Sequence, residues 1–171
     1  MPVVIRALTP ADDRSRFESG DIELDRFFRR FAGQNQFRHH TGVTYVAAEG
    51  STLLGFVTVA AASIETTHLP ATTRNRLPSY PLPVLRVARL AVDGHVKGQG
   101  IGVALLRYAL LLAHEMAGKL GCVGVVVDAK PDAVSFYARF GFVPLESEGG
   151  RLRDLPAPRP MFVELGAIPK I

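Results

Sequence analysis

The sequence predicts an α/β fold whose sheet contains strands of mixed direction. Three observations support this prediction. Apolar, β-branched runs bounded by glycine, proline and polar residues are typical of strands, and residues 84–92 form the clearest central one. Residues 101–120 have the apolar spacing of a long helix. Most of the expected strands follow one another along the chain with this helix between them, which favours pairing along the sequence.

The length and composition are those of a single domain over residues 1–171, because 47% hydrophobic residues can build a full core. The formal net charge of +4 is compatible with a polyanionic partner without requiring one. We expect no membrane span, because charged or polar residues interrupt the longest apolar stretches: Arg86, Arg89, Arg107 and His114. The N-terminus has early acidic residues and no apolar signal core, so a cytoplasmic location is expected.

The single cysteine and the five histidines give no indication of a metal site. Cys122 lies in an apolar run and cannot form an internal disulfide, so we expect a buried structural thiol rather than a nucleophile. The histidines lack metal-ligand spacing, and His39 and His40 are expected in a solvated loop.

The N-terminal third is expected to contain a strand and two helices. Residues 3–8 predict the strand, and residues 9–12 a helix entry with Thr9 as its cap and Pro10 in the first turn. A second helix is expected over residues 22–36. Its apolar face would contain Leu24, Phe27, Phe28 and Phe31, and its basic face Arg26, Arg29 and Arg30. A solvated face is the alternative explanation for those arginines.

A hairpin is expected from residues 44–48 and 53–63, with its turn at residues 49–51. The proline-rich connection over residues 64–83 is long for a passive loop, so it should make contacts or contain a short helical turn. The buried face of the long helix is expected to comprise Leu105, Leu106, Ala109, Leu110, Leu112, Ala113, Met116 and Leu120, and Gly121 should end it.

The last third predicts a doubly buried strand, a short helix and two further strands. The strand spans residues 123–127, and the helix spans residues 131–140 and ends at Gly141. A strand begins at residues 142–143, and the last strand covers residues 161–165 after a loop over residues 149–160.

The stretch Lys97-Gly-Gln-Gly-Ile-Gly102 joins the central strand to the long helix. Its glycines lack side chains where a backbone approaches a ligand closely, and its amides would open a helix whose dipole favours an anion. A P-loop is excluded because no Gly-Lys-Ser/Thr follows, and the GxGxxG spacing fails at its third glycine. The pattern predicts a site for the pyrophosphate of coenzyme A, and a tight strand-to-helix turn is the alternative.

Four motifs together make nearly the whole chain similar to the GNAT (Gcn5-related) acetyltransferases. They are Leu90-Ala-Val92, the glycine stretch just described, Asp128-Ala-Lys130, and Phe136-Tyr-Ala-Arg-Phe-Gly-Phe142. In the family pattern Gln/Arg-x-x-Gly-x-Gly/Ala, Lys97 stands at the Gln/Arg position. The resemblance implies a mixed, mostly antiparallel central sheet flanked by helices, the GNAT acyl-CoA N-acyltransferase fold, with acetyl-CoA as cofactor.

A narrower resemblance, to the GNAT toxins of bacterial type II toxin–antitoxin systems, is carried by residues 17–25, 55–59, 89–93 and 127–130. It implies a toxin that acetylates the α-amino group of aminoacyl-tRNA and so inhibits translation. A ribbon–helix–helix antitoxin and a homodimer are the partners that it implies. The alternatives are a GNAT enzyme that acetylates a small-molecule or protein amine, and a non-catalytic module that binds coenzyme A or nucleic acid.

The resemblance also assigns roles to individual residues. Backbone groups at residues 90–92 would pair with the pantetheine arm, and the Val92 amide would stabilise the oxyanion. The full set expected to bind the cofactor is Leu90, Ala91, Val92, Lys97, Gly98, Gln99, Gly100, Ile101, Gly102 and Phe136. Tyr137 would protonate the leaving thiolate, since a phenol of pKa ~10 faces a thiol of pKa ~8.5. A purely packing role is the alternative for Tyr137.

The central strand contains no Asp or Glu, although many relatives place a glutamate base there. An α-amine with a pKa near ~7.7 is already substantially neutral, so the missing carboxylate is compatible with an aminoacyl-tRNA substrate that loses its proton to water. Asp93 and Asp128 are the carboxylates nearest in sequence, and either could instead cap a turn.

Binding of tRNA predicts arginines around the acceptor site, because phosphate contacts dominate nucleic-acid affinity. The candidates are Arg89, Arg86, Arg29, Arg30, Arg38, Arg74 and Arg76, together with Arg26. Arg89 is favoured because an arginine on a mostly apolar strand needs a partner or a ligand. An internal salt bridge or a dimer contact is the alternative for Arg89.

Overall fold

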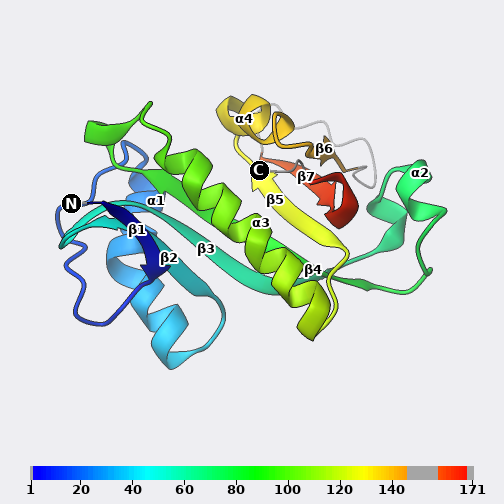
Figure 1. The fold of residues 1–171 in the computed structure, drawn as a ribbon, viewed down its shortest axis with the longest axis horizontal. Coiled ribbons are helices and arrows are strands. Elements are labelled where there is room, and N and C mark those ends of the chain that lie inside the picture. Colours follow the sequence, from blue (N-terminus) through cyan, green and yellow to red (C-terminus); the bar gives the residue numbers. More distant parts are fainter. Residues whose placement is uncertain (1, 146–157, 169–171) are drawn as a thin grey trace. The chain divides into compact units, whose positions relative to one another are not determined.

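The computed structural model describes residues 2–145 and 158–168, and Figure 1 shows the elements along the chain. Its strands are β1 (Val3–Ala7), β2 (Val43–Glu49), β3 (Thr52–Ile64), β4 (Leu82–Val92), β5 (Gly124–Ala129), β6 (Val143–Pro144) and β7 (Arg159–Glu164). They form one sheet in the order β1-β2-β3-β4-β5-β7-β6. The pairs β1–β2, β2–β3, β5–β7 and β6–β7 are antiparallel, so the predicted α/β class with a mostly antiparallel sheet is confirmed.

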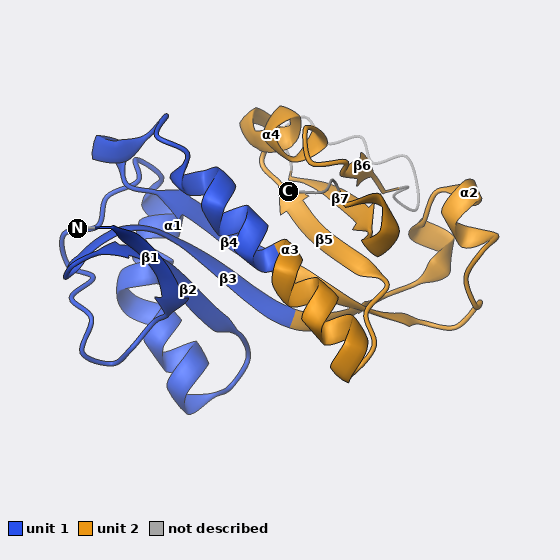
Figure 2. Cartoon of the chain, viewed as in Figure 1, with its two compact units in different colours: residues 1–60, 87–109 blue, residues 61–86, 110–171 orange. Residues whose placement is uncertain are grey.

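The chain divides into two compact units (Figure 2). Unit 1 contains residues 1–60 and 87–109, and unit 2 contains residues 61–86 and 110–171. Strands β3 and β4 and the long helix α3 (Ile101–Lys119) each contribute residues to both units. The glycine stretch therefore belongs to unit 1, and Tyr137 belongs to unit 2.

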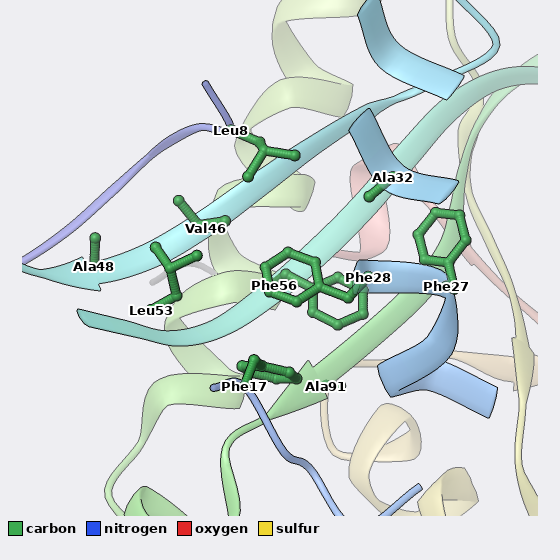
Figure 3. Packing of buried hydrophobic residues seen from close by; sticks show 10 residues of the cluster. All are labelled: Leu8, Phe17, Phe27, Phe28, Ala32, Val46, Ala48, Leu53, Phe56 and Ala91. Atoms are coloured by element: carbon green, nitrogen blue, oxygen red, sulfur yellow. The ribbon is translucent and has the colours of Figure 1, made fainter. Parts of the chain in front are cut away.

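The core of unit 1 is organised around an aromatic stack. The rings of Phe28 and Phe56 lie 4.3 Å apart and nearly parallel, and both side chains are fully buried. Phe17 packs edge-on against both rings, at 4.8 Å from Phe28 and 5.5 Å from Phe56. Figure 3 shows the cluster, which also contains Leu8, Phe27, Ala32, Val46, Ala48, Leu53 and Ala91. These contacts hold the segments at Phe17 and Phe28 against strands β2, β3 and β4.

The predicted second helix is present, but most of it is not a regular α-helix. One α-helical turn, α1 (Ile22–Arg26), continues into the wider π-type turns η1 (Phe27–Phe31) and η2 (Gln34–Arg38). We call residues 22–38 the helical arm. Its predicted apolar face is correct for the buried Phe27 and Phe28, but Phe31 is 38% exposed. A wider turn rotates the following side chains away from the positions that a spacing of 3.6 predicts.

The predicted helix entry at residues 9–12 is wrong, because side chains close a turn there instead. The carboxylate of Asp12 accepts the backbone N–H of Thr9 at 2.8 Å and two hydrogen bonds from the Arg6 guanidinium at 2.8 Å. The carboxylate of Asp13 accepts both the N–H and the hydroxyl of Ser15. Such local side-chain bonds satisfy backbone donors outside a helix and so compete with helix formation.

The hairpin between β2 and β3 is confirmed, and Gly50 occupies its turn with φ of +60°. The connection to β4 contains the predicted short helical turns, η3 (Thr66–His68) and α2 (Ala71–Arg74).

The described elements of unit 2 after β5 also follow the prediction. A short helical segment is formed by η5 (Pro131–Ala133) and α4 (Val134–Ala138), and Gly141 with φ of +89° follows it. Of the loop expected over residues 149–160, residues 149–157 lie outside the described part, and Arg159 and Pro160 already belong to β7. Cys122 is buried and its thiol donates to the carbonyl of Gly124 at 3.2 Å, as expected of a structural cysteine.

Helix α3 carries the expected buried stripe, with Leu105, Leu106, Ala109, Leu110 and Ala113 inaccessible. Leu120 was expected in this stripe but is 83% exposed, because the helix ends at Lys119 and the N–H groups of Leu120 and Gly121 both turn back to the Met116 carbonyl.

By length and composition alone, helix α3 could cross a membrane. Arg107 and His114 therefore do not exclude a membrane span, contrary to the expectation from the sequence. The buried stripe of α3 packs in the core of the protein.

Replacing Phe28 by Ala should lower the free energy of unfolding by about 3–5 kcal/mol, because it removes a fully buried ring from the aromatic stack. Denaturant unfolding measures this change. Ile22→Ala on the same helical arm is the matched control, because Ile22 is 84% exposed and its loss should cost about 0.5 kcal/mol or less. Equal losses for the two variants would contradict the proposed core.

Candidate active site

The glycine stretch leaves a row of backbone donors without protein partners. After β4, a short turn η4 (Gly94–Val96) leads to Gly98 and Gly100, whose φ angles of +80° and +82° are left-handed. Within the described part of the chain, no N–H group from Gly98 to Val103 donates to a protein acceptor, and the first helical bond runs from the Ala104 N–H to the Gly100 carbonyl at 3.0 Å. Unpaired amides at the start of a 19-residue helix can receive an anion, because they lie at the positive end of the helix dipole.

No protein atoms crowd the two left-handed glycines of this stretch. A Cβ atom built on Gly98 or on Gly100 would meet no atom within 4 Å. The left-handed backbone, rather than crowding by the protein, is therefore what disfavours a side chain at these positions. The open space is what a ligand held by these amides would occupy.

Gly55 in β3 fixes where α3 begins, and sequence reasoning did not single it out as a site residue. A Cβ on Gly55 would lie 2.9 Å from the Ala91 carbonyl oxygen, 2.9 Å from Leu105 Cδ1 and 3.0 Å from Ile101 Cγ2. The first turns of α3 thus pack directly on β3 beside β4. The signal was available in the sequence, because a glycine inside a strand marks a close approach of another segment.

Asp93 acts as a structural cap between β4 and the glycine stretch. One carboxylate oxygen accepts the N–H of His95 at 2.9 Å and contacts its Nδ1 at 2.8 Å, and the other accepts the N–H of Glu18 at 3.1 Å. Burial tends to raise the pKa of Asp93, but the hydrogen bonds from His95 and Glu18 outweigh it and lower the pKa. Asp93 is therefore an ionised, fully engaged carboxylate rather than a free base.

Asp128, the other carboxylate considered, forms an ion pair with Arg86 at 2.6 Å. Both groups belong to unit 2 and are partly exposed. The carboxylates nearest in sequence to the expected site are thus both occupied by protein partners, which agrees with an acceptor amine that needs no side-chain base.

The remaining residues expected to bind the cofactor differ in accessibility. On β4, Ala91 is buried, and Leu90 and Val92 are half-buried. In the glycine stretch Ile101 is buried, Gly102 is half-buried and Gln99 is exposed. Lys97 is exposed, but its ammonium group donates to the backbone carbonyl of Ser19 at 2.6 Å.

Tyr137 lies in α4, and its side chain is buried among aromatic rings. The side chain is 6% exposed, and its ring meets Phe136 and Phe142 edge-on at 5.2 Å and 5.5 Å. Within residues 2–145 and 158–168, the Tyr137 hydroxyl forms no hydrogen bond. Burial of the ring raises the pKa of Tyr137 to about 12, which keeps the phenol protonated as a hydrogen-bond donor.

Arg89 lies over an aromatic ring of the helical arm. Its guanidinium carbon is 3.9 Å from the ring centroid of Phe27, and burial lowers the pKa of Arg89. The expected alternative of an internal salt bridge is not found among residues 2–145 and 158–168. The ring holds one face of the guanidinium, and its N–H groups point along the guanidinium plane rather than into the ring.

The other predicted arginines fall into two groups. Several have protein partners: Arg76 forms a two-pronged pair with Glu164, Arg86 pairs with Asp128, and Arg29 donates to the Phe17 carbonyl. In the described part of the chain Arg30, Arg38 and Arg74 form no ion pair. Arg26 lies 5.9 Å from the ring centroid of Phe31. Among the predicted arginines, those without a carboxylate partner in the described residues are thus Arg26, Arg29, Arg30, Arg38, Arg74 and Arg89.

Gly100→Ala should weaken binding of acetyl-CoA at least tenfold, because a methyl group would enter the open space beside the unpaired amides. It should lower the free energy of unfolding by only about 1–2 kcal/mol, the cost of a left-handed non-glycine residue. Calorimetric titration and denaturant unfolding measure the two effects. Gly118→Ala in α3 also meets open space, and this control should leave affinity unchanged.

The phenol of Tyr137 should stay protonated when exposed tyrosines ionise near pH ~10. Because burial raises its pKa to about 12, the difference in tyrosinate absorbance between the wild-type protein and Tyr137→Phe should appear only around that pH. Activity should likewise show no loss through ionisation of this phenol below pH ~10. A difference signal that titrates near pH ~10 would contradict the buried environment.

Comparisons with known proteins identify the family of this chain. The model of the acetyltransferase (GNAT) domain matches residues 40–144. A Mycobacterium tuberculosis protein named tRNA-acetylating toxin is 33% identical over 138 residues, which cover 80% of this chain and 82% of that protein.

Two solved structures of the AtaT toxin are also similar. AtaT complexed with acetyl-methionyl-tRNAfMet has a TM-score of 0.86 at 25% identity and covers 97% of this chain and 96% of its own. A mutant AtaT bound to acetyl-CoA and the C-terminus of the antitoxin AtaR has a TM-score of 0.78 at 24% identity and covers 98% and 96%, a likeness of fold. The domain match and the sequence relative together show that this chain belongs to the GNAT acetyltransferase family.

Proposed function

We propose that this protein is an acetyl-CoA-dependent N-acetyltransferase that modifies the α-amino group of aminoacyl-tRNA and thereby acts as a toxin that inhibits translation. The observation that carries the proposal is the 33% identity, over four fifths of both chains, to a tRNA-acetylating toxin. The unpaired amides and the protonated phenol are the parts that this reaction needs. AtaT, which shares the fold, has been solved with acetylated tRNA and with acetyl-CoA.

The donor site uses the backbone at the end of β4 and the start of α3. The amides of Gly98, Gly100, Ile101 and Gly102 would receive the diphosphate of acetyl-CoA, because they are unpaired and lie at the positive end of the helix dipole. Residues 90–92 would pair with the pantetheine arm like an added strand, with Phe136 contributing to the cofactor site. Acetyl-CoA supplies an activated thioester.

Acetyl transfer forms a C–N bond to the acceptor amine and breaks the C–S bond of the thioester. The Val92 amide would stabilise the negative charge that develops on the carbonyl oxygen. Tyr137 would give its phenolic proton to the leaving thiolate, since burial keeps that proton in place at physiological pH. The acceptor amine loses its proton to water, which is sufficient for an α-amine with a pKa near ~7.7, and solvent returns a proton to the Tyr137 phenolate.

The acceptor site would be basic, because tRNA binding depends on phosphate contacts. Arg89 is the first candidate, since its guanidinium is already fixed over the Phe27 ring. Arg30, Arg38 and Arg74 extend the candidate set, and Arg26 and Arg29 lie on the same helical arm. Arg76 and Arg86 would have to exchange their carboxylate partners for phosphate.

We further propose that the chain acts as a single catalytic domain in the cytoplasm, where charged tRNA is found. A ribbon–helix–helix antitoxin is the expected partner, and a homodimer the expected assembly, as the resemblance to the GNAT toxins implies. AtaT is bound by the C-terminus of its antitoxin AtaR.

Incubation with acetyl-CoA and charged tRNA should give N-acetyl-aminoacyl-tRNA, detected by mass spectrometry of the released aminoacyl group. Tyr137→Phe should lower kcat by about 100-fold, because it removes the proton donor, while the Kd for acetyl-CoA stays within about twofold. Tyr80→Phe is the matched control, since Tyr80 is 63% exposed, and it should keep full activity.

Three outcomes would contradict the proposal. Absence of acetylated product with every charged tRNA would exclude the tRNA substrate. Efficient acetylation of a small amine with little salt dependence would favour the alternative acceptor class, because tRNA binding must weaken as salt rises. Acetyl-CoA binding without turnover on any amine would favour a non-catalytic module.

A further inference from the structure

The segment that precedes α1 is cross-linked to the turn that precedes the glycine stretch. The N–H of Glu18 donates to Asp93 at 3.1 Å, and the N–H of Gly94 donates back to the Glu18 carbonyl at 2.8 Å. One residue later, the Lys97 ammonium donates to the Ser19 carbonyl at 2.6 Å. All of these residues belong to unit 1 (Figure 2). The backbone at residues 18–19 is therefore hydrogen-bonded to the segment that leads into the glycine stretch.

The same backbone is held from the helical arm by a buried carboxylate. Asp25 of α1 and Ser19 are each only 5% exposed. The Asp25 carboxylate accepts the Ser19 N–H at 3.0 Å and the Ser19 hydroxyl at 2.6 Å. Gly20, with φ of +95°, turns the chain between them, and a Cβ there would lie 3.7 Å from the Lys97 nitrogen. Asp25, Ser19 and Lys97 thus form a continuous connection from α1 to the glycine stretch.

We propose that Lys97 is a positioning residue. It fixes the position of the helical arm relative to the glycine stretch and does not contact the diphosphate. The proposal rests on the proposed function for the identity of the acceptor, because the arm carries arginines assigned to tRNA. An ammonium bonded to a carbonyl makes a charge-assisted hydrogen bond. When Lys97 is removed, the Ser19 carbonyl loses this donor, and the backbone before the arm keeps only the hydrogen bonds of Glu18 with Asp93 and Gly94 on that side.

A positioning role and a diphosphate contact predict different effects on donor binding and on acceptor use. A lysine on the diphosphate would set the affinity for the donor, and its removal would raise the Kd for coenzyme A. A lysine that positions the arm would leave donor affinity intact and lower kcat/KM for the acceptor. Small misplacements of binding groups cost large factors in rate, so a decrease of about 10- to 100-fold is expected.

The test measures three quantities for the wild-type protein and Lys97→Met. They are the Kd for coenzyme A by calorimetry, kcat/KM for charged tRNA, and hydrogen exchange of the Glu18 and Ser19 amides, whose hydrogen bonds are described above. We expect Lys97→Met to change the Kd less than about twofold, to lower kcat/KM by the stated factor, and to speed exchange at both amides. Lys97→Arg keeps a donor for the Ser19 carbonyl and should restore both kcat/KM and slow exchange.

Matched variants separate positioning from charge and from stability. Lys119→Met removes the same charge at an exposed position of α3 and should change none of the three quantities. Ser19→Ala removes the hydroxyl that donates to Asp25 and accepts the N–H of Asp21, without changing the charge, and it should lower kcat/KM while leaving the Kd for coenzyme A unchanged. Thermal unfolding identifies any variant that is merely unstable.

A Kd for coenzyme A raised tenfold or more in Lys97→Met, with unchanged amide exchange, would overturn the proposal in favour of a diphosphate contact. Unchanged values for all three quantities would overturn it as well. If the wild-type protein acetylates no charged tRNA, the proposed function fails, whereas the Kd and the exchange rates still decide the role of Lys97.

Discussion

The close packing of the first turns of α3 on β3 at Gly55 is the constraint on which the site depends. Because no side chain separates them, Ile101 and Leu105 reach the strand beside the Ala91 carbonyl. This contact places the unpaired amides of the glycine stretch next to the end of β4, where an extended arm could pair. An acetyl donor with a diphosphate and an amide-containing arm needs unpaired amides for the diphosphate and an open strand end for the arm. The packing at Gly55 places these two features side by side in unit 1.

A second set of contacts extends this constraint to the helical arm of unit 1. The buried pair of Ser19 and Asp25 joins the helical arm to the segment before it, and Asp93 and Lys97 join that segment to the glycine stretch. The stack of Phe28 on Phe56 holds the same arm against the sheet through apolar contacts. Polar connections set the register of the arm, and burial of aromatic surface supplies most of its stability.

Much of the fold could be predicted because its signals are local. The strands, the hairpin and the end of α3 follow from β-branched runs, turn residues and Gly121. The errors have equally physical origins. At residues 9–12 the side chain of Asp12 closes a turn with Arg6 and Thr9, a choice that propensity at Thr9 and Pro10 does not reveal. In the helical arm, π-type turns displaced Phe31 from the expected face.

For the site, sequence patterns indicated the glycine stretch and Tyr137 but could not assign partners. Whether an arginine pairs with a carboxylate depends on residues distant in the chain, as Arg76 with Glu164 and Arg86 with Asp128 show. The hydrogen bond from Lys97 to the Ser19 carbonyl joins residues far apart in the sequence, and no sequence pattern predicts it. The left-handed glycines at 98 and 100 have a genetic consequence. Since the free protein leaves room for a side chain there, inactivating alleles at these codons should still yield abundant folded polypeptide.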